Sequence, residues 1–490
     1  MSGSTTQHTE TTGRPQPTRN TGQKIAYAFG NLGQAAFYNT MSTFFITFVT
    51  TALFIDVDKT LAKRLIAVIT GLVVVIRIAE IFLDPLLGNL VDNTNTRWGR
   101  FRPWQFIGGI VPGILLIMVF TGLFGLVDVN TGVFMVLFVI VFILLDVIYS
   151  LRDISYWGMI PAISSDSHER STYTALGAFT GSIGYNGVTV IVVPVVSWFT
   201  WKFTGQWEQG RTGWAAFAII IAVLGLLTAW SVAFGTRENQ GGLRAKAEAN
   251  GNPIEAFKAI AQNDHLRGVA LSYLLYSVAN VTPGVLFFQF KYVLGVPDRF
   301  SIAGIIPVIT GLGTTPLYPV LNRRIPRRWL YTAGMALMIA GYTLFIIAPM
   351  NLPVVIVALV LFYLPAQTIQ MTAILSMTDS IEYGQLKTGK RNEAVTLSVR
   401  PMLDKIAGAL SNGIVGFVVV AAGMVGNATA ADMTAANIRT FKTCAYYLPL
   451  AGIVASLVVF LLTVKIDENM HAHIVEQLEG RLASEEADKQ

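Results

Sequence analysis

The sequence predicts an all-α membrane protein with twelve transmembrane helices in two six-helix halves. Hydrophobic residues make up 53% of the 490 residues and charged residues only 13%, whereas charged residues make up about a quarter of a soluble domain. The mean hydropathy is +0.55. Apolar stretches of about 20 residues, enough to cross a bilayer as a helix, recur twelve times. They are centred near residues 40, 75, 115, 143, 187, 223, 280, 310, 338, 363, 408 and 455.

Polar segments divide the chain into five parts. Residues 1–22 lack the apolar core and cleavage site of a secretory signal and are predicted to be a disordered cytoplasmic tail. The longest internal loop, 235–264, is predicted to be a cytoplasmic middle loop between an N-terminal bundle at 23–234 and a C-terminal bundle at 265–465. Residues 466–490 are charged and helix-prone, and we expect a second cytoplasmic tail.

The distribution of Lys and Arg predicts the orientation of the chain. Loops that follow the even-numbered stretches hold about twice as many Lys and Arg residues as the alternate loops, and positive charge favours the cytoplasmic side. Both termini are therefore expected in the cytoplasm, with the chain spanning the cell (inner) membrane. Attraction to the inner leaflet accounts for the net charge of +6, so nucleic-acid binding is not expected. Cys444 is the single cysteine, which excludes an intrachain disulfide.

Loops at corresponding positions of the two halves resemble one another. SSDSHERSTY follows the fourth stretch and DSIEYGQLKTGKRNEAV the tenth; both are acidic and then basic. NLVDNTNTRWGRFRP follows the second stretch and PVLNRRIPRRW the eighth; both are basic. The similar loops indicate that the halves are parallel repeats, as in the major facilitator architecture. In that architecture, substrate binds between the halves near the bilayer midplane.

The second stretch, VVIRIAEIFLDPLLG, carries three charges in an apolar setting. A charge at the centre of a membrane helix costs about 2.5 to 3.5 kcal/mol on insertion scales, so such residues usually mark a substrate or ion path. Arg77, Glu80 and Asp84 are spaced to share one helix face. They are either a structural salt-bridge network or a cation site, in which the two carboxylates converge on Na⁺ or share a proton.

The fourth stretch carries Arg152 and Asp153, with Asp146 one to two turns away. Tyr149, Asp153 and Trp157 recur every four residues and form a stripe along the helix. A carboxylate accepts hydrogen bonds from neighbouring hydroxyl groups, and an indole offers a flat apolar surface to a sugar ring, so the stripe is a candidate sugar site. Alternatively, Trp157 is an interfacial residue and Asp153 pairs with Arg152.

A family resemblance extends over both halves of the chain. DPLLGNLVDNTNTRWGRFRPWQ strongly resembles the DPxxGxxxDxxxxRWGxxxPW signature of the glycoside-pentoside-hexuronide:cation symporters, the melibiose permease family of the major facilitator superfamily. YAFGNLGQ, YSLRDISYWGMIPAIS, DSIEYGQLK and DKIAG extend the match. The resemblance implies import of a sugar or glycoside by symport with Na⁺, Li⁺ or H⁺.

The resemblance also implies roles for individual residues, position by position. The family's cation-binding carboxylates lie on the second helix, its sugar-binding carboxylate and indole on the fourth, and a lysine on the eleventh. The corresponding residues are Glu80 and Asp84 for the cation, with Ser150 as a nearby hydroxyl; Asp153, Trp157 and Tyr149 for the sugar; and Arg77 and Lys405 for coupling.

The sequence departs from the family pattern at three positions. Ala35 and Ala178 stand where melibiose-transporting members carry a sugar-binding Asp and an Arg, so galactoside specificity does not carry over. Leu83 replaces an Asn of Na⁺-using members, which removes a neutral oxygen ligand and favours H⁺ over Na⁺. The neutral polar side chains expected to supply replacement hydrogen bonds are Gln34, Tyr38, Asn39, Gln367 and Gln370.

The eleventh stretch carries a third charged cluster, Arg400, Asp404 and Lys405. We expect Lys405 to pair with the carboxylates of the second stretch when the cation is absent. The loop after the second stretch is expected to act as a cytoplasmic gate, with an ordinary basic loop as the alternative. The gate residues are Asp92, Arg97, Arg100 and Arg102.

Motifs typical of enzymes test whether the protein belongs to a class other than transporters. The sequence contains no HExxH metal helix and no GxSxG nucleophile elbow, so an enzyme is not expected. No cofactor is expected, and the only ion expected to bind is the coupling ion, H⁺ or Na⁺. The expected partners are the sugar and the bilayer, and we expect a functional monomer. The remaining alternative is a carrier of the same fold for another substrate, such as a lysophospholipid.

Overall fold

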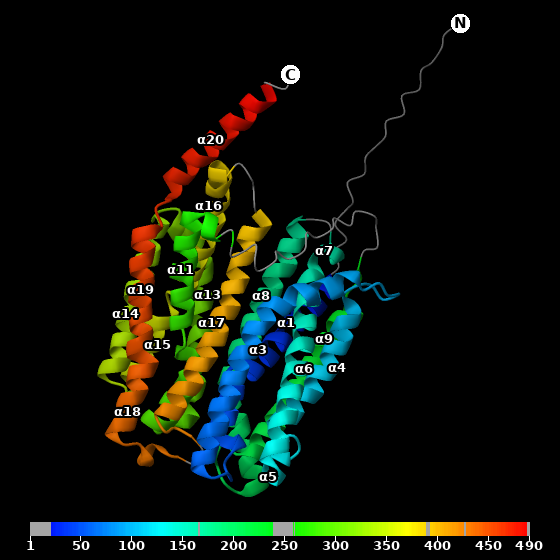
Figure 1. Cartoon of the computed structure of the whole chain (residues 1–490), viewed down its shortest axis with the longest axis vertical. Helices are drawn as coiled ribbons and strands as arrows, with labels where there is room; N and C mark the ends of the chain where they lie inside the picture. Colours follow the sequence, from blue (N-terminus) through cyan, green and yellow to red (C-terminus); the bar gives the residue numbers. More distant parts are fainter. Residues whose placement is uncertain are drawn as a thin grey trace.

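The computed structural model of the chain is a bundle of long helices that run roughly side by side (Figure 1). Most of the predicted tail at 1–22 and of the predicted middle loop at 235–264 lies outside the part of the chain that the structure describes. The described residues are 21–164, 167–238, 258, 260–388, 393–425 and 428–487.

Ten helical stretches among the described residues are long and apolar enough to cross a membrane. The two other expected spans, centred near residues 40 and 310, coincide with a helical run at 21–53 and with α13 (Ser301–Asn322). The predicted all-α membrane fold is therefore confirmed, and the chain is a multi-pass membrane protein.

In the first group, capping side chains mark the starts of two long helices. The Asp58 carboxylate accepts hydrogen bonds from the backbone N–H groups of Thr60 (2.9 Å) and Leu61 (3.1 Å) and so begins α3. Asn130 begins α6 in the same way. The group comprises α1 (Thr21–Asn39), η1 (Thr40–Phe44), α2 (Phe45–Phe48), η2 (Val49–Leu53), α3 (Lys59–Asn93), α4 (Arg102–Phe120), α5 (Leu126–Val129), α6 (Thr131–Gly158), α7 (Ile160–Ile163), α8 (Ser167–Thr204) and α9 (Arg211–Gly235).

The second group uses asparagine caps as well. The Asn263 side chain accepts from the N–H of Leu266 (3.0 Å) at the start of α11, and Asn351 caps α15. The group comprises α11 (Asp264–Ala279), α12 (Thr282–Phe288), η3 (Gln289–Val293), η4 (Pro297–Phe300), α13, α14 (Arg327–Ile347), α15 (Leu352–Tyr363), α16 (Ala366–Thr388), α17 (Glu393–Ala421), η5 (Ala430–Asp432), α18 (Ala435–Lys442), η6 (Thr443–Tyr447), α19 (Leu448–Thr463) and α20 (Glu468–Ala487).

Each group packs mainly on itself, and the two meet along two seams. Within the groups, α1 packs against α8 and α9, and α11 packs against α17 and α19; between them, α3 contacts α17, and α8 contacts α13. Glycines allow the close approach at both seams. A Cβ on Gly416 would lie 2.3 Å from the Thr70 side chain, and one on Gly304 would lie 2.9 Å from the carbonyl oxygen of Asn186. This packing agrees with a two-half architecture, while the residue bounds given above for the halves remain a prediction.

Three hydrogen bonds between the groups lie toward one end of the bundle. We call it the α18 end, because α5 and α18 lie there, and the opposite one the α20 end (Figure 1). Within the helix-prone segment predicted at 466–490, Glu468–Ala487 form α20, which packs against α16. These three bonds run from Trp207 to Asp298 (3.1 Å), from Ser301 to the carbonyl oxygen of Val190 (2.6 Å) and from Asn412 to Ser42 (3.1 Å).

Candidate functional site

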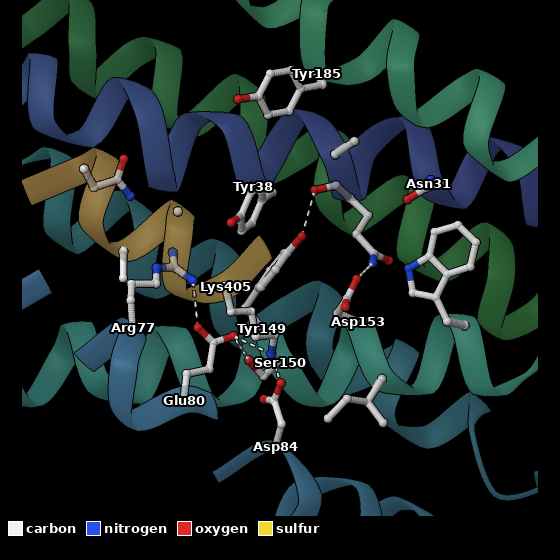
Figure 2. Close-up of a pocket in the computed structure, with 17 residues that line it drawn as sticks. Asn31, Tyr38, Arg77, Glu80, Asp84, Tyr149, Ser150, Asp153, Tyr185 and Lys405 are labelled. Carbon is white, nitrogen blue, oxygen red and sulfur yellow. Dashed lines mark hydrogen bonds and ion pairs between the residues drawn. The ribbon is translucent and has the colours of Figure 1, made fainter. Parts of the chain in front are cut away.

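A polar cavity of about 290 Å³ lies where α1, α3, α6, α8 and α17 meet (Figure 2). It is lined by residues from both groups of helices, which matches the predicted position of a substrate between two halves. Ten of the predicted site residues line it. They are Gln34, Tyr38, Arg77, Glu80, Asp84, Tyr149, Ser150, Asp153, Trp157 and Lys405.

Arg77 and Glu80 on α3 form an ion pair at one end of the cavity. The distance from Arg77 Nη1 to Glu80 Oε2 is 3.1 Å, and the same nitrogen lies 2.8 Å from Oδ1 of Asp146 on α6. Ser150 Oγ donates a hydrogen bond of 2.8 Å to Glu80 Oε1. The guanidinium group of Arg77 lies over the ring of Tyr38, 5.5 Å from its centroid. The Glu80 carboxylate therefore contacts the guanidinium group of Arg77 on its own helix and the hydroxyl group of Ser150 on α6.

Lys405 joins the two groups of helices at this point. Its ammonium group contacts Asp84 and lies 3.5 Å from Glu80 Oε1. Because Lys405 lies on α17 and the carboxylates lie on α3, these ion pairs cross the seam between the groups. The structure thus pairs Lys405 with both carboxylates of α3, and its dependence on the coupling ion remains a prediction.

The ion-paired cluster carries more negative than positive charge. Arg77 and Lys405 supply two positive charges, and Glu80, Asp84 and Asp146 supply three negative charges when all are ionised, which leaves a net charge of −1. Net charge in a low-dielectric interior is costly. A cluster of this kind is suited to take up one cation or proton.

The candidate sugar site lies on the other side of Tyr149. Asp153 Oδ1 accepts a hydrogen bond of 2.5 Å from Gln34 Nε2, and the Tyr149 hydroxyl donates to the backbone carbonyl oxygen of Gln34 (3.2 Å) (Figure 2). The Trp157 side chain lines the same cavity and is 38% exposed. One carboxylate, one indole and a free amide oxygen of Gln34, which has no hydrogen-bond partner, therefore converge where a polyhydroxylated ligand would fit.

Arg152 does not pair with Asp153. Its side chain is 1% exposed and lies between α4 and α9, where Nη2 donates to Thr228 Oγ1 at 3.5 Å and the chain packs over Gly108. Successive residues of a helix point about 100° apart, which separates these two side chains. Asp153 thus faces the cavity and Arg152 faces the interior of the first group.

Three of the predicted replacement groups lie elsewhere. Gln367 and Gln370 are on α16 and are not among the residues that line the cavity. The Asn39 amide donates to the carbonyl oxygen of Tyr185 (2.6 Å) and to Thr189 Oγ1 (3.1 Å), so it joins α1 to α8. Sugar binding by Gln367 and Gln370 remains a prediction.

Several cavity residues were missed by the sequence analysis. Asn412 lies seven residues after Lys405 on α17, two turns along the same face, and the helical period alone could have identified it. Asn31 precedes Gln34 by three residues and is found by the same reasoning. Tyr185 on α8 has no charged neighbour in the sequence, and no local signal marks it.

The predicted gate loop is held by Glu238, a residue that the sequence analysis did not select. Its carboxylate accepts hydrogen bonds from the backbone N–H groups of Arg100 (2.7 Å), Phe101 (2.9 Å) and Arg102 (3.1 Å) at the start of α4. Gly99, with φ of +114°, passes so close that a Cβ would lie 2.5 Å from this carboxylate. These contacts join the loop to the end of α9, in the same group of helices.

The other gate residues are placed as follows. Arg102 Nε donates to the carbonyl oxygen of Ala233 at 2.5 Å, again on α9. Arg97 is exposed. Asp92 lies in α3, and its side chain is outside the described part of the structure. A gating role for these residues therefore remains a prediction.

Replacing Glu238 with Ala is expected to destabilise the start of α4. The carboxylate serves three helix-terminal N–H groups, and the loss of a helix N-cap costs about 0.5 to 2 kcal/mol. Thermal unfolding of the purified protein in detergent should show a lower midpoint, and Glu208→Ala, at an exposed site, serves as the control. An unchanged midpoint in Glu238→Ala would show that the loop is held by other contacts.

A membrane-spanning bundle of two helix groups, with a polar ion-paired cavity between them, defines a secondary transporter of the major facilitator type. The chain belongs to the glycoside-pentoside-hexuronide:cation symporter family of this superfamily. The family profile described as MFS/sugar transport protein matches residues 26–468. This family transports sugars, and the chain is accordingly not an enzyme.

Curated relatives agree with this assignment, and solved structures share the fold. The chain is 51% identical to a lactose permease of Leuconostoc lactis over 94% of this chain and 72% of the relative. It is 38% identical to a raffinose carrier protein of Pediococcus pentosaceus, over 94% and 71%. The xylose transporter XylE of E. coli, in a partially occluded inward open conformation, shares the fold with a TM-score of 0.59 at 16% identity, over 92% and 98%. The nucleoside transporter NupG does so with a TM-score of 0.62 at 15% identity, over 90% and 100%. None of these relatives supports the lysophospholipid alternative.

Proposed function

We propose that the protein imports a small oligosaccharide by symport with a cation, H⁺ in preference to Na⁺, through alternating access. The observation that carries the proposal is the cavity itself. It brings the Lys405-paired carboxylates Glu80 and Asp84 together with the candidate sugar residues Asp153 and Trp157. An ion site and a sugar site that share one cavity can each change the affinity of the other.

The sugar assignment is supported by the relatives and by the chemistry of the cavity. The two relatives reported above are named for lactose and raffinose, both small oligosaccharides. Asp153 offers acceptor oxygens, Gln34 offers an unpartnered carbonyl oxygen, and Trp157 offers an apolar face. Such a set recognises hydroxyl groups and the C–H face of a ring.

The choice of H⁺ rests on what occupies the space between the carboxylates. The Lys405 nitrogen contacts both Glu80 and Asp84, and Arg77 Nη1 lies between Glu80 and Asp146. Na⁺ binding requires several oxygen ligands to converge on one point, by the logic of hard cations, whereas a proton needs a single carboxylate oxygen. Asp84 Oδ1 is buried without a hydrogen-bond partner and is a suitable acceptor.

The transport cycle follows from the seam between the groups. We propose that the α20 end is cytoplasmic, together with both termini, and that the hydrogen bonds at the α18 end close the cavity toward the outside. In the empty carrier Lys405 holds α17 against α3. A cation at Glu80 and Asp84 weakens this attraction, and a ligand shifts a conformational equilibrium through such a difference in affinity between states.

Replacing Lys405 with Gln is expected to impair coupling. Without its ammonium group the empty carrier keeps uncompensated carboxylates, so the empty and loaded states no longer differ in the contact across the seam. Sugar uptake driven by an ion gradient in proteoliposomes should fall toward the level of downhill entry, while Lys202→Gln, at an exposed site, should behave as wild type. Unchanged gradient-driven uptake would remove Lys405 from the mechanism.

The proposal is tested by uptake into proteoliposomes of purified wild-type protein. A panel of mono- and disaccharides is offered under an inward H⁺ gradient and, separately, under an inward Na⁺ gradient. We expect a disaccharide to accumulate under the H⁺ gradient. Accumulation under the Na⁺ gradient alone would make Na⁺ the coupling ion, and no accumulation under either would contradict symport. Binding of a lysophospholipid in place of every sugar would favour the alternative carrier.

A further inference from the structure

We propose that Asp146 is a positioning residue that couples the cation site to the sugar site. Asp146 gives Arg77 a second carboxylate partner beside Glu80. When the cation site is loaded, Arg77 shifts from Glu80 to Asp146, and this changes how α6 presents Asp153 to the sugar. This inference rests on the proposed symport. It assigns a role to a residue that belongs to neither the expected cation site nor the expected sugar site.

The contacts of Arg77 show a side chain divided between two partners. One nitrogen, Nη1, donates a hydrogen bond to Glu80 Oε2 (3.1 Å) and forms an ion pair with Asp146 Oδ1 (2.8 Å), which accepts no hydrogen bond. Nε and Nη2 of Arg77 are buried and have no hydrogen-bond partner. Arg77 is 5% exposed and Asp146 is 2% exposed, so neither charge is relieved by water. An arginine could form a two-pronged pair with either carboxylate, but in this state it forms a complete pair with neither.

The surroundings of Asp146 offer few other charges. On its own helix the polar neighbours are Tyr149 and Ser150, and α3 presents Arg77 and Glu80. α1 presents Tyr38, whose ring lies over Arg77. α4 beyond Arg102 and α9 beyond Arg211 contain no Asp, Glu, Lys, Arg or His. The Lys405 ammonium group is paired with Asp84 and Glu80 instead.

The spacing along α6 connects this pair to the sugar site. Asp146, Ser150 and Asp153 occupy positions i, i+4 and i+7 and so lie along one face of the helix. Ser150 donates to Glu80 Oε1, and Asp146 shares Arg77 with Glu80. α6 therefore contacts Glu80 twice, once directly and once through Arg77, within two turns of the sugar carboxylate.

Loading the cation site changes the balance between these contacts. A cation at Glu80 reduces the attraction of Glu80 for both Arg77 and Ser150. Arg77 can then form a complete pair with Asp146, and α6 loses its hold on α3 at Ser150. The re-pairing requires Asp146 to stay ionised throughout, and it carries the state of the cation site to the helix that holds Asp153. Coupling between two sites requires such an element with two arrangements.

The test measures sugar affinity with and without the coupling ion. Purified wild-type protein should bind its sugar more tightly with saturating ion by a factor of roughly 5 to 150, the usual range for coupled sites. In Asp146→Asn this factor should fall below about 2, because the amide offers Arg77 no charged alternative. Asp56→Asn changes a carboxylate that is 74% exposed and should keep the wild-type factor, and Asp146→Glu should restore part of it.

A purely structural role for Asp146 predicts a different result. The folded fraction of Asp146→Asn, isolated by size-exclusion chromatography, would then show the wild-type factor at a lower yield, and that result would overturn the inference. Should Asp146→Asn fail to fold, Arg77→Lys keeps the buried charge but cannot serve two carboxylates with one fork. We expect a reduced factor in that variant, and a wild-type factor would overturn the inference.

The same measurement separates this inference from the proposed function. If wild-type protein shows no dependence of sugar affinity on either H⁺ or Na⁺, the proposed symport fails. If wild-type protein shows the dependence and Asp146→Asn shows it equally, symport stands and only the role of Asp146 fails.

Discussion

The variant Asp153→Asn is expected to lose sugar binding while it keeps its fold. The carboxylate accepts one hydrogen bond from Gln34 inside the folded protein, and the amide oxygen of Asn can still accept it. An amide cannot accept from two sugar hydroxyl groups as a carboxylate does. Hydrogen bonds to a charged group contribute about 1.5 to 3 kcal/mol each, so the loss of two weakens binding by at least about a hundredfold.

Equilibrium binding of labelled sugar to purified protein measures this effect. Asp56→Asn makes the same change, carboxylate to amide, at an exposed residue and should bind sugar as wild type does. Circular dichroism and size exclusion check that Asp153→Asn is folded. If Asp153→Asn binds sugar normally, Asp153 is a structural residue and the sugar site lies elsewhere in the cavity.

The variant Asp84→Asn should equilibrate sugar across the membrane but fail to concentrate it. We expect α6 to provide most of the sugar contacts, so downhill exchange should stay partly active. The amide at position 84 cannot take up the coupling charge, and Lys405 keeps only Glu80 as its partner. The loaded and empty states then no longer differ in charge at this residue, and without a difference in affinity a gradient cannot drive the cycle in one direction.

Labelled sugar in proteoliposomes distinguishes the two activities. Asp84→Asn should reach equal concentrations inside and outside under an imposed pH or Na⁺ gradient, where wild type reaches a higher concentration inside. Glu80→Gln removes the other carboxylate and should also lower accumulation. If both variants concentrate sugar like wild type, Arg77, Glu80 and Asp84 form a structural salt-bridge network and the cation site lies elsewhere.

Two features of the sequence predicted the fold and most residues of the site: the length of the apolar stretches and the spacing of the charges within them. Apolar stretches of membrane-spanning length predicted the helices, because a backbone in lipid must satisfy its own hydrogen bonds. Charges in those stretches are costly, which identified Arg77, Glu80 and Asp84, and the helical period correctly placed them on one side of α3. The same reasoning identified Lys405, to which the resemblance gave a coupling role; it lies far away in the sequence and reaches the same cavity.

What could not be predicted depends on how the helices are rotated and packed. Asp146 and Arg152 are both charged residues of the same stretch, but Asp146 pairs with Arg77 and Arg152 turns toward α4 and α9. Glu238 stands next to a loop with no apolar period, and only the path of the chain brings it to the start of α4. Gln370 was selected by composition, which does not specify the face it occupies on α16.

We propose that sugar and a proton move together and that Glu80 and Asp84 of α3 carry the proton, and sugar-driven proton movement tests this proposal most directly. Sugar is added outside proteoliposomes that have no ion gradient, and the pH of a weakly buffered external medium is recorded. We expect the medium to become alkaline with wild-type protein, because each sugar that enters carries a proton inward, and we expect no change with Asp84→Asn. If sugar enters the wild-type vesicles with no change in external pH, or if Asp84→Asn alkalinises the medium as wild type does, the account is contradicted.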